Sequence, residues 1–310
     1  MKFWNQLAEI EGGFGPTVVT IGKFDGVHLG HRALLRAATK AARVASYRSV
    51  CLTFDRHPDA LLAPERVPLP LTGPNQKAEL IAAAGIDATL QLCFDEDFAH
   101  LSPREFVEQV LVGALKAKHV VVGDDFRFGS RGAGTITMLA EFGIEFGFAV
   151  EVVAPVLVDG RRVSTSIIRE LLDSGDVTTA AAMLGRLHAT RGCVEHGLKL
   201  GRQLGFPTAN LSRGSEGFLP LDGVYAGWLH CDGERYPAAL SVGINETIQA
   251  VPRLLEAHVL DRKDLDLYDK TVTCEYVSFL RPAAKFNGID ELIAAIGDDC
   301  DRIREILANS

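Results

Sequence analysis

A chain of 310 residues, 47% of them hydrophobic, can bury the cores of one large domain or of two medium-sized domains. Its formal net charge of −8 argues against a nucleic-acid partner, which would require an excess of basic residues. No apolar run approaches the roughly 18 residues of a membrane span, and the first residues lack the apolar core of a signal peptide. The six cysteines are scattered without a C-x-x-C pair, so we expect reduced thiols and a cytoplasmic protein.

The first clear element is a buried strand at residues 18–21, a short run of mostly β-branched apolar residues. Glycines that permit tight turning follow it, at Gly22, Gly26 and Gly30. Helical spacing begins near Leu29, so His28 and His31 fall on one face of a first helical turn. Free N–H groups and the helix dipole favour an anion there. The pattern favours a polyphosphate site over an ordinary turn with two surface histidines.

The rest of the first half alternates between strands and helices. We expect strands at 50–54, 88–94 and 119–123, and helices at 75–84 and from Ser102. A Pro-rich loop is expected at 64–74. In an open α/β sheet, ligands bind beyond the carboxyl ends of the strands. His57 follows the strand 50–54, so it is a candidate site residue, although a Pro-terminated turn explains it equally well.

Two further segments of this half carry polar or aromatic side chains in positions that suit a nucleotide. The strand 119–123 leads into Asp125, Phe126 and Phe128, which could form a nucleotide and ring pocket or simply pack in a loop. Residues 164–166 are Ser-Thr-Ser at the start of a helix, and Arg169 follows them. One N-cap needs a single hydroxyl, so three hydroxyls with an arginine favour contacts to phosphate oxygens.

The second half has a different pattern. Residues 177–186 form a short Ala-rich helix, which we interpret as a linker. Short strands follow from about residue 187, and we expect them at 224–229, 236–242, 254–260 and 272–280. Their regular spacing predicts a small antiparallel barrel. A final helix closes the chain, with an apolar face formed by Ile289, Leu292, Ile293, Ile296, Ile303, Ile306 and Leu307.

Four motifs resemble those of known flavin enzymes. Residues 22–31 resemble the G-x-F-D-G-x-H-x-G-H signature of bacterial flavin adenylyltransferases, which belong to the HxGH nucleotidyltransferase superfamily. Residues 123–129 resemble the G-x-D-F-R-F-G motif of the same enzymes, and residues 164–169 resemble their Ser-Ser-Thr-x-x-Arg pattern. Residues 197–211 closely resemble the G-x-x-x-G-R-x-x-G-F-P-T-A-N-L signature of riboflavin kinases.

The resemblance covers nearly the whole chain and implies a bifunctional riboflavin kinase and FAD synthetase. The implied fold class is α/β, with a Rossmann-like nucleotidyltransferase domain followed by a small antiparallel β-barrel with a closing helix. Residues 1–176 would form the FMN adenylyltransferase domain, 177–186 the linker helix, and 187–310 the riboflavin kinase domain. Riboflavin, FMN and ATP are the implied substrates, and Mg²⁺ is the implied cofactor.

The resemblance also implies a role for each motif residue. Glu256, in a segment similar to the family's E-x-h-x-L-D, would be the base that takes the riboflavin hydroxyl proton. Thr208 and Asn210 offer neutral oxygens to Mg²⁺, which needs few protein ligands. His28 and His31 would act on the polyphosphate. ATP and phosphate would contact Gly22, Phe24, Gly26, Gly30, Ser164, Thr165, Ser166, Arg169, Gly201 and Arg202. Flavin and nucleotide would contact His57, Asp125, Phe126, Phe128 and Pro207.

The chain departs from the family pattern at two places. Glu246 and Ile248 stand where the family has Pro and Phe, in a loop that helps to close the kinase site. Asp269 stands where the family has Gly, which we interpret as a turn change with little chemical effect. One alternative is therefore an enzyme with a single active module, its kinase weakened by the 243–248 loop. The others are a different HxGH nucleotidyltransferase fused to a barrel, and a flavin-binding regulator without turnover. The residues do not decide the oligomeric state, and a homo-oligomer is among the options.

Overall fold

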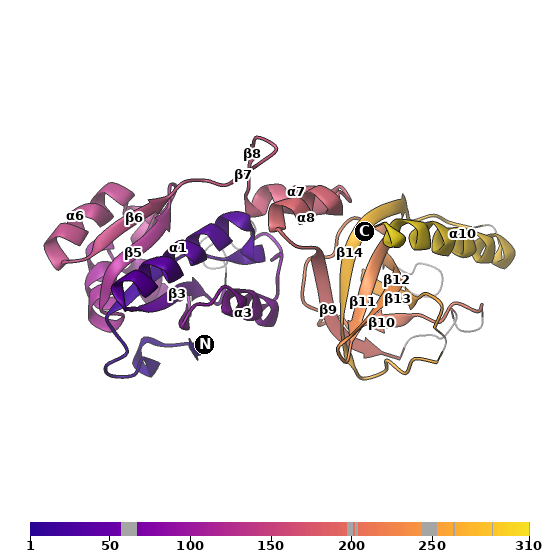
Figure 1. Cartoon of the computed structure of the whole chain (residues 1–310), viewed down its shortest axis with the longest axis horizontal. Helices are drawn as coiled ribbons and strands as arrows, with labels where there is room; N and C mark the ends of the chain where they lie inside the picture. Colours follow the sequence, from indigo (N-terminus) through magenta and orange to yellow (C-terminus); the bar gives the residue numbers. More distant parts are fainter. Residues whose placement is uncertain are drawn as a thin grey trace. The chain divides into compact units, whose positions relative to one another are not determined.

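In the computed structural model the chain forms two compact units (Figure 1). The first comprises Met1–Leu69 and Pro74–Val163, and the second comprises Pro70–Gly73 and Ser164–Ser310. The structure describes residues 1–56, 67–196, 201, 204–243, 253–262, 264–286 and 288–309. Among these residues no helix has both the length and the apolar character that crossing a bilayer requires.

The first unit is built on a six-stranded parallel sheet, as the alternating pattern predicted. Its strands are β1 (Lys2–Trp4), β2 (Thr17–Ile21), β3 (Arg48–Phe54), β4 (Ala88–Leu92), β5 (Ala117–Gly123) and β6 (Ala149–Val153). They lie in the order β1-β4-β3-β2-β5-β6, so the strand order reverses between β2 and β5. Ligands bind in open α/β sheets at this kind of switch point, outside the carboxyl ends of the strands.

Helices lie on both faces of this sheet (Figure 1). They are α1 (Leu29–Ala45), α3 (Pro74–Ala83), α4 (Glu96–His100), α5 (Pro103–Glu105) and α6 (Ile136–Phe146), with a π-helical segment, η4 (Phe106–Ala114), after α5. Short 3₁₀ turns, η1 (Leu7–Glu9), η2 (Asp25–Val27) and η5 (Ser130–Gly132), lie between them. Alternate residues of β2 serve the two faces, because Val18 packs towards Leu35 of α1 and Val19 packs with Phe106. Both predicted helices are confirmed, and Ser102 starts α5 with a capping box to Glu105.

A closed antiparallel barrel forms the core of the second unit, as the strand spacing predicted. The strands are β9 (His188–Glu195), β10 (Ala209–Leu211), β11 (Gly223–Cys231), β12 (Glu234–Gly243), β13 (Leu254–Val259) and β14 (Thr271–Pro282), in the order β10-β13-β12-β11-β14-β9. Two helices precede the barrel, α7 (Thr165–Asp173) and α8 (Val177–Leu184). The helix expected at 177–186 is therefore present, and it packs on β14 and β9 within this unit. A small hairpin in the first unit, β7 (Leu157–Val158) and β8 (Arg161–Arg162), comes before them.

The closing helix, α10 (Ile289–Ala308), uses less of its apolar face than the sequence suggested. Cys300, Ile303 and Leu307 pack against Ala226 and other barrel residues. The prediction that Ile289 belongs to this buried face is wrong, because its side chain is 63% exposed. Its position at the first residue of the helix, beyond the reach of the barrel core, explains the difference.

Candidate active sites

The turn between β2 and α1 has an unusual backbone. Phe24 and Val27 both have positive φ values, 51° and 39°, in addition to Gly26 at 77°. Such angles are costly for a residue with a side chain, above all for a β-branched one, and persist only when the surroundings enforce them. Here both side chains are fully buried, and the Thr53 hydroxyl donates to the Lys23 carbonyl at 3.0 Å. A strained, over-determined turn of this kind is typical of a functional site.

The two histidines of this turn form one stacked pair. Their ring centroids lie 3.6 Å apart with an angle of 13° between the planes. His28 is the N-cap of α1, and its Nδ1 accepts the His31 backbone N–H at 3.3 Å. Because Nδ1 is an acceptor, neutral His28 carries its proton on Nε2. Gly30 permits the stack, since a Cβ there would lie 3.1 Å from the His28 ring.

His31 is in a different electrostatic state from an exposed histidine. Its Nδ1 is buried, and no described residue offers it a hydrogen-bond partner. Burial and the neighbouring His28 hold the pKa of His31 well below its usual range. The ring is therefore neutral at pH 7, and an unmet buried polar atom is costly unless a ligand or water satisfies it.

The segment after β5 lies at the same edge of the sheet, since β5 is the parallel neighbour of β2. Phe126 and Phe128 stack with centroids 5.6 Å apart, and Phe128 is buried in the core beside Phe106. Arg162 of the β7–β8 hairpin donates to Asp125 at 3.0 Å and also to Asp124. Phe128 therefore has a packing role, and the ring pocket predicted here stays a prediction.

The other residues predicted for this site lie outside the described residues or in the second unit. His57 lies outside the described residues. Ser164 belongs to the second unit, where it is the N-cap of α7 and its hydroxyl accepts the Ile167 N–H at 3.3 Å. Thr165 and Ser166 form the first turn of that helix, where the backbone N–H groups have no partner within the helix. The Ser-Thr-Ser segment thus has the local geometry expected of a phosphate contact, and that contact remains a prediction.

The kinase motifs meet on the outer face of the barrel. Asn210 of β10 and Glu256 of β13 stand directly opposite each other in the antiparallel register, so their side chains share one face. Both are half-buried, between inward-pointing neighbours. Thr208 precedes β10, and the His258 ring lies 2.8 Å from the Pro207 carbonyl. The predicted metal ligand and the predicted base are therefore neighbours in the structure.

Gly201 packs closely against the backbone that leads from Phe206 to Thr208. The Phe206 N–H donates to the Gly201 carbonyl at 2.8 Å. A Cβ on Gly201 would lie 2.4 Å from the Phe206 carbonyl oxygen and 3.5 Å from the Thr208 hydroxyl. Only glycine fits this approach without moving the backbone that carries Thr208, a predicted metal ligand.

We therefore expect Gly201→Ala to reduce riboflavin phosphorylation by roughly tenfold or more, because it displaces Thr208, with FMN adenylylation unchanged. Steady-state rates of the two reactions on one preparation check this. Gly205→Ala is a poor control because Gly205 has a φ of 89°, so Gly214→Ala, where a Cβ meets nothing within 4 Å, is the matched control. Equal kinase rates for Gly201→Ala and the parent chain would contradict the close approach.

Three other kinase residues lie outside the described residues: Arg202, Glu246 and Ile248. Asp269 is described, and its φ of 60° explains the departure from the family's glycine. This left-handed conformation suits glycine, and aspartate is among the residues that tolerate it best. The substitution is therefore a turn change, as the sequence suggested.

Comparison with known proteins finds a family model for each half of the chain. The FAD synthetase family model matches residues 13–167, and the riboflavin kinase family model matches residues 184–307. A bifunctional riboflavin kinase/FMN adenylyltransferase from Pseudomonas fluorescens is 37% identical over 294 residues, 94% of each chain. The chain belongs to the bifunctional riboflavin kinase/FMN adenylyltransferase family. Its counterpart in Escherichia coli is 35% identical and covers 91% of this chain and 90% of that protein.

A solved structure shows the same similarity in three dimensions. It is described as a macrolide-efflux protein from Streptococcus pneumoniae and is 31% identical to this chain. Its TM-score is 0.88, and the match covers 97% of this chain and 98% of that one. The family resemblance inferred from the motifs is thus confirmed, and no comparison favours a different nucleotidyltransferase fused to a barrel.

The structure adds an aromatic cluster that the motifs did not single out in this family member. Phe54, at the carboxyl end of β3, makes an edge contact with Phe94 and a tilted contact with Phe98, with centroids 5.5 and 5.6 Å away. The Phe94 backbone N–H donates to Asp55 at 3.0 Å. Phe94 and Phe98 follow β4, so the clue in the sequence was their place after a strand that pairs with β3.

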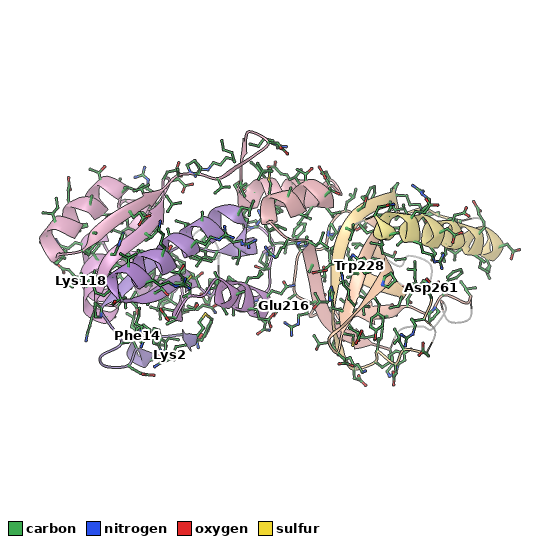
Figure 2. The ribbon with its side chains drawn as sticks, viewed as in Figure 1. Lys2, Phe14, Lys118, Glu216, Trp228 and Asp261 are labelled. Atoms are coloured by element: carbon green, nitrogen blue, oxygen red, sulfur yellow. The ribbon has the colours of Figure 1, made fainter. Side chains whose placement is uncertain are left out.

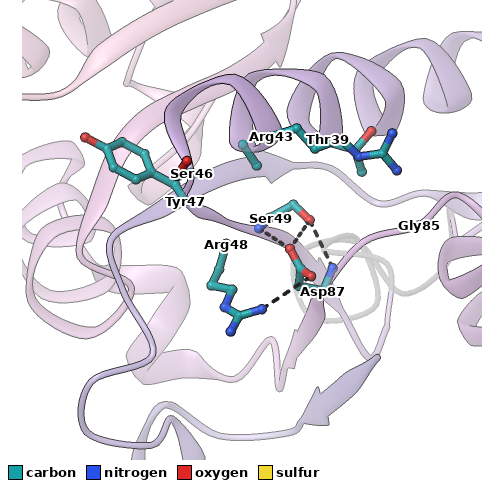
Figure 3. Close-up of a pocket in the computed structure, with 9 residues that line it drawn as sticks. Thr39, Arg43, Ser46, Tyr47, Arg48, Ser49, Gly85 and Asp87 are labelled. Atoms are coloured by element: carbon teal, nitrogen blue, oxygen red, sulfur yellow. Dashed lines mark hydrogen bonds and ion pairs between the residues drawn. The ribbon is translucent and has the colours of Figure 1, made fainter.

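A groove of about 400 Å³ lies at the other end of the sheet (Figure 3). It lies where α1 ends and β3 begins, and its lining includes Arg43 and Arg48. Asp87 is already satisfied there, because it accepts from both the backbone N–H and the hydroxyl of Ser49 at 2.8 Å. None of the residues predicted for catalysis lines this groove, so we assign the chemistry to the opposite edge.

Proposed function

We propose that this chain makes FAD from riboflavin in two ATP-dependent steps. The barrel phosphorylates riboflavin to FMN, and the parallel-sheet half transfers an adenylyl group from ATP to FMN and releases pyrophosphate. The observation that supports this best is that each half holds its own set of groups, the Asn210–Glu256 pair and the stacked His28–His31 pair. We assign the two reactions to residues 187–310 and 1–176, although α7 packs with the second unit.

In the kinase step, Glu256 takes the proton of the riboflavin hydroxyl that attacks the γ-phosphorus of ATP. The residues beside it fit Mg²⁺, since Thr208 and Asn210 present neutral oxygens and this ion keeps several waters and binds substrate phosphates. Among the described residues there is no cluster of three His, Cys, Asp or Glu side chains that would form an all-protein metal cage. Bound there, the ion would neutralise charge on the phosphates, while Gly201 keeps its loop close to Thr208.

In the adenylyl step, the FMN phosphate is already an anion and needs no general base. The task of the protein is to stabilise charge on the polyphosphate and on the departing pyrophosphate. His28 can donate through Nε2, and its stacked neighbour His31 holds the ring in place. The hydroxyls of residues 164–166 and the Arg169 guanidinium stay predicted phosphate contacts, on the family pattern of the sequence.

One assay tests the whole proposal. Purified protein with riboflavin, ATP and Mg²⁺ should form FMN first and FAD later, with the flavins resolved by chromatography. If FMN forms and FAD does not, only the kinase module is active. If neither FMN nor FAD forms, the result favours a flavin-binding regulator. The loop whose changes could weaken the kinase lies within residues 244–252, which the structure does not describe. The rate of FMN formation in this assay therefore also tests whether the kinase is weakened.

Removal of the metal gives a separate prediction. We expect excess EDTA to abolish riboflavin phosphorylation, because Thr208 and Asn210 alone carry no charge to offset the phosphates. Added Mg²⁺ should restore the rate, and Ca²⁺, which is larger, should restore less. Phosphorylation that continues in EDTA after dialysis of every solution would contradict the metal assignment.

A further inference from the structure

Lys77 is a partly buried charge that neither proposed reaction uses. It lies in α3, and its Nζ donates to the Phe54 carbonyl at 2.8 Å, at the carboxyl end of β3. Burial lowers the pKa of this ammonium group, while the charges of Asp25, Cys51 and Asp55 oppose the shift. A buried lysine is unfavourable unless it is hydrogen-bonded and close to opposite charge, so this arrangement needs an explanation.

The position of Asp25 suggests the explanation. Asp25 belongs to the strained turn between β2 and α1, between Phe24 and Gly26, and that turn packs against α3. Backbone strain of this kind is retained only where neighbouring groups hold it. Lys77 is well placed for this, because one ammonium group bonds to the end of β3 and attracts the carboxylate of the turn.

We infer that Lys77 is a positioning residue for adenylyl transfer, which ties the β2–α1 turn to the end of β3 and so fixes the stacked His28–His31 pair. This inference rests on the proposed adenylyl step in the same unit. Lys77 acts through the Asp25 turn and has no bond to make or break itself. Because catalytic groups must be held within a fraction of an ångström, loss of the tie reduces turnover more than substrate binding.

The test measures both reactions on the full chain. We expect Lys77→Met to lower kcat for FAD formation from FMN by about 10- to 100-fold, with a small change in KM. Riboflavin phosphorylation by the same molecules stays at the parent rate. Lys77→Arg, which keeps the charge, recovers part of the loss. Lys118→Met is the matched control, since Lys118 (labelled in Figure 2) also donates to a backbone carbonyl, that of Gly147 at 3.4 Å. Lys118 lies near the start of β5, which is level with the start of β2, whereas the turn follows the end of β2.

Two further measurements separate positioning from other roles. Asp25→Asn should lower kcat for FAD formation about as much as Lys77→Met does. The double variant should lose no more than the more impaired single variant, because both changes remove the same interaction between Lys77 and Asp25. In NMR spectra, the imidazole signals of His28 and His31 should shift in Lys77→Met and not in Lys118→Met. That readout needs no turnover, so it tests the inference even if the parent chain makes no FAD. Unmoved imidazole signals, multiplicative effects in the double variant, or a loss confined to KM would each overturn the inference.

Discussion

Glu256→Gln should lower the rate of riboflavin phosphorylation by about 10²- to 10⁴-fold, the usual cost of losing a general base. The amide keeps the size of the side chain and its place opposite Asn210, but it cannot take the hydroxyl proton. FMN supplied from outside should still become FAD at the parent rate, because no barrel residue is assigned to that step. Separate assays with riboflavin and with FMN, on one preparation, measure the two rates.

Glu275→Gln is the matched control for this prediction. Glu275 is also a half-buried glutamate that points out of the barrel, on β14, where it pairs with His230 at 2.9 Å. The same chemical change there should leave phosphorylation unchanged. An equal kinase loss in both variants would mean that Glu256 acts through barrel stability. Loss of both activities in a folded Glu256→Gln variant would require one site shared by the two reactions.

The sequence predicted those elements whose apolar residues face one way or are buried on both sides. β2, β3 and β5 are mostly buried strands inside a parallel sheet, with β-branched runs in β2 and β5, and the strands β11 to β14 alternate as half-buried strands do. The sequence did not predict β9, because polar side chains point into the barrel along this strand. His188 bonds to the Phe218 carbonyl at 2.6 Å, and Thr190 bonds to the Tyr276 hydroxyl at 2.9 Å. A local sequence pattern cannot indicate hydrogen-bond partners that lie so far away along the chain.

The sequence likewise predicted some features of the two sites, while others are visible only in the structure. Spacing placed His28 and His31 on one helical face, and the structure adds that His28 caps the helix and that the rings stack. The pairing of Asn210 with Glu256 depends on barrel register, which the motifs do not contain. The contact of Lys77 with Phe54 joins residues 23 positions apart on different elements, so only the folded chain shows it. Helical spacing likewise says nothing about which unit α7 packs against.

His28→Ala combined with His31→Ala should reduce FAD formation from FMN by at least about 10²- to 10³-fold, the cost of removing one donor aimed at developing charge. The departing pyrophosphate would lose the Nε2–H of His28, and the ring that holds it would be gone. Riboflavin should still be phosphorylated at the parent rate, so this variant should accumulate FMN. The time course of both flavins, followed by chromatography, measures the effect.

Two controls decide whether the donor itself matters. His28→Ala also removes the cap of α1, which is worth about 1 kcal/mol, so the double variant alone mixes catalysis with stability. His28→Asn keeps a side-chain oxygen for the His31 N–H, and it should lose FAD formation nearly as fully while its unfolding temperature stays near that of the parent chain. His119→Ala removes another half-buried histidine of the same unit, which faces Glu151 at 3.4 Å, and should leave FAD formation unchanged. Near-parent activity in His28→Asn would show that the cap, and not the donor, is what adenylyl transfer requires.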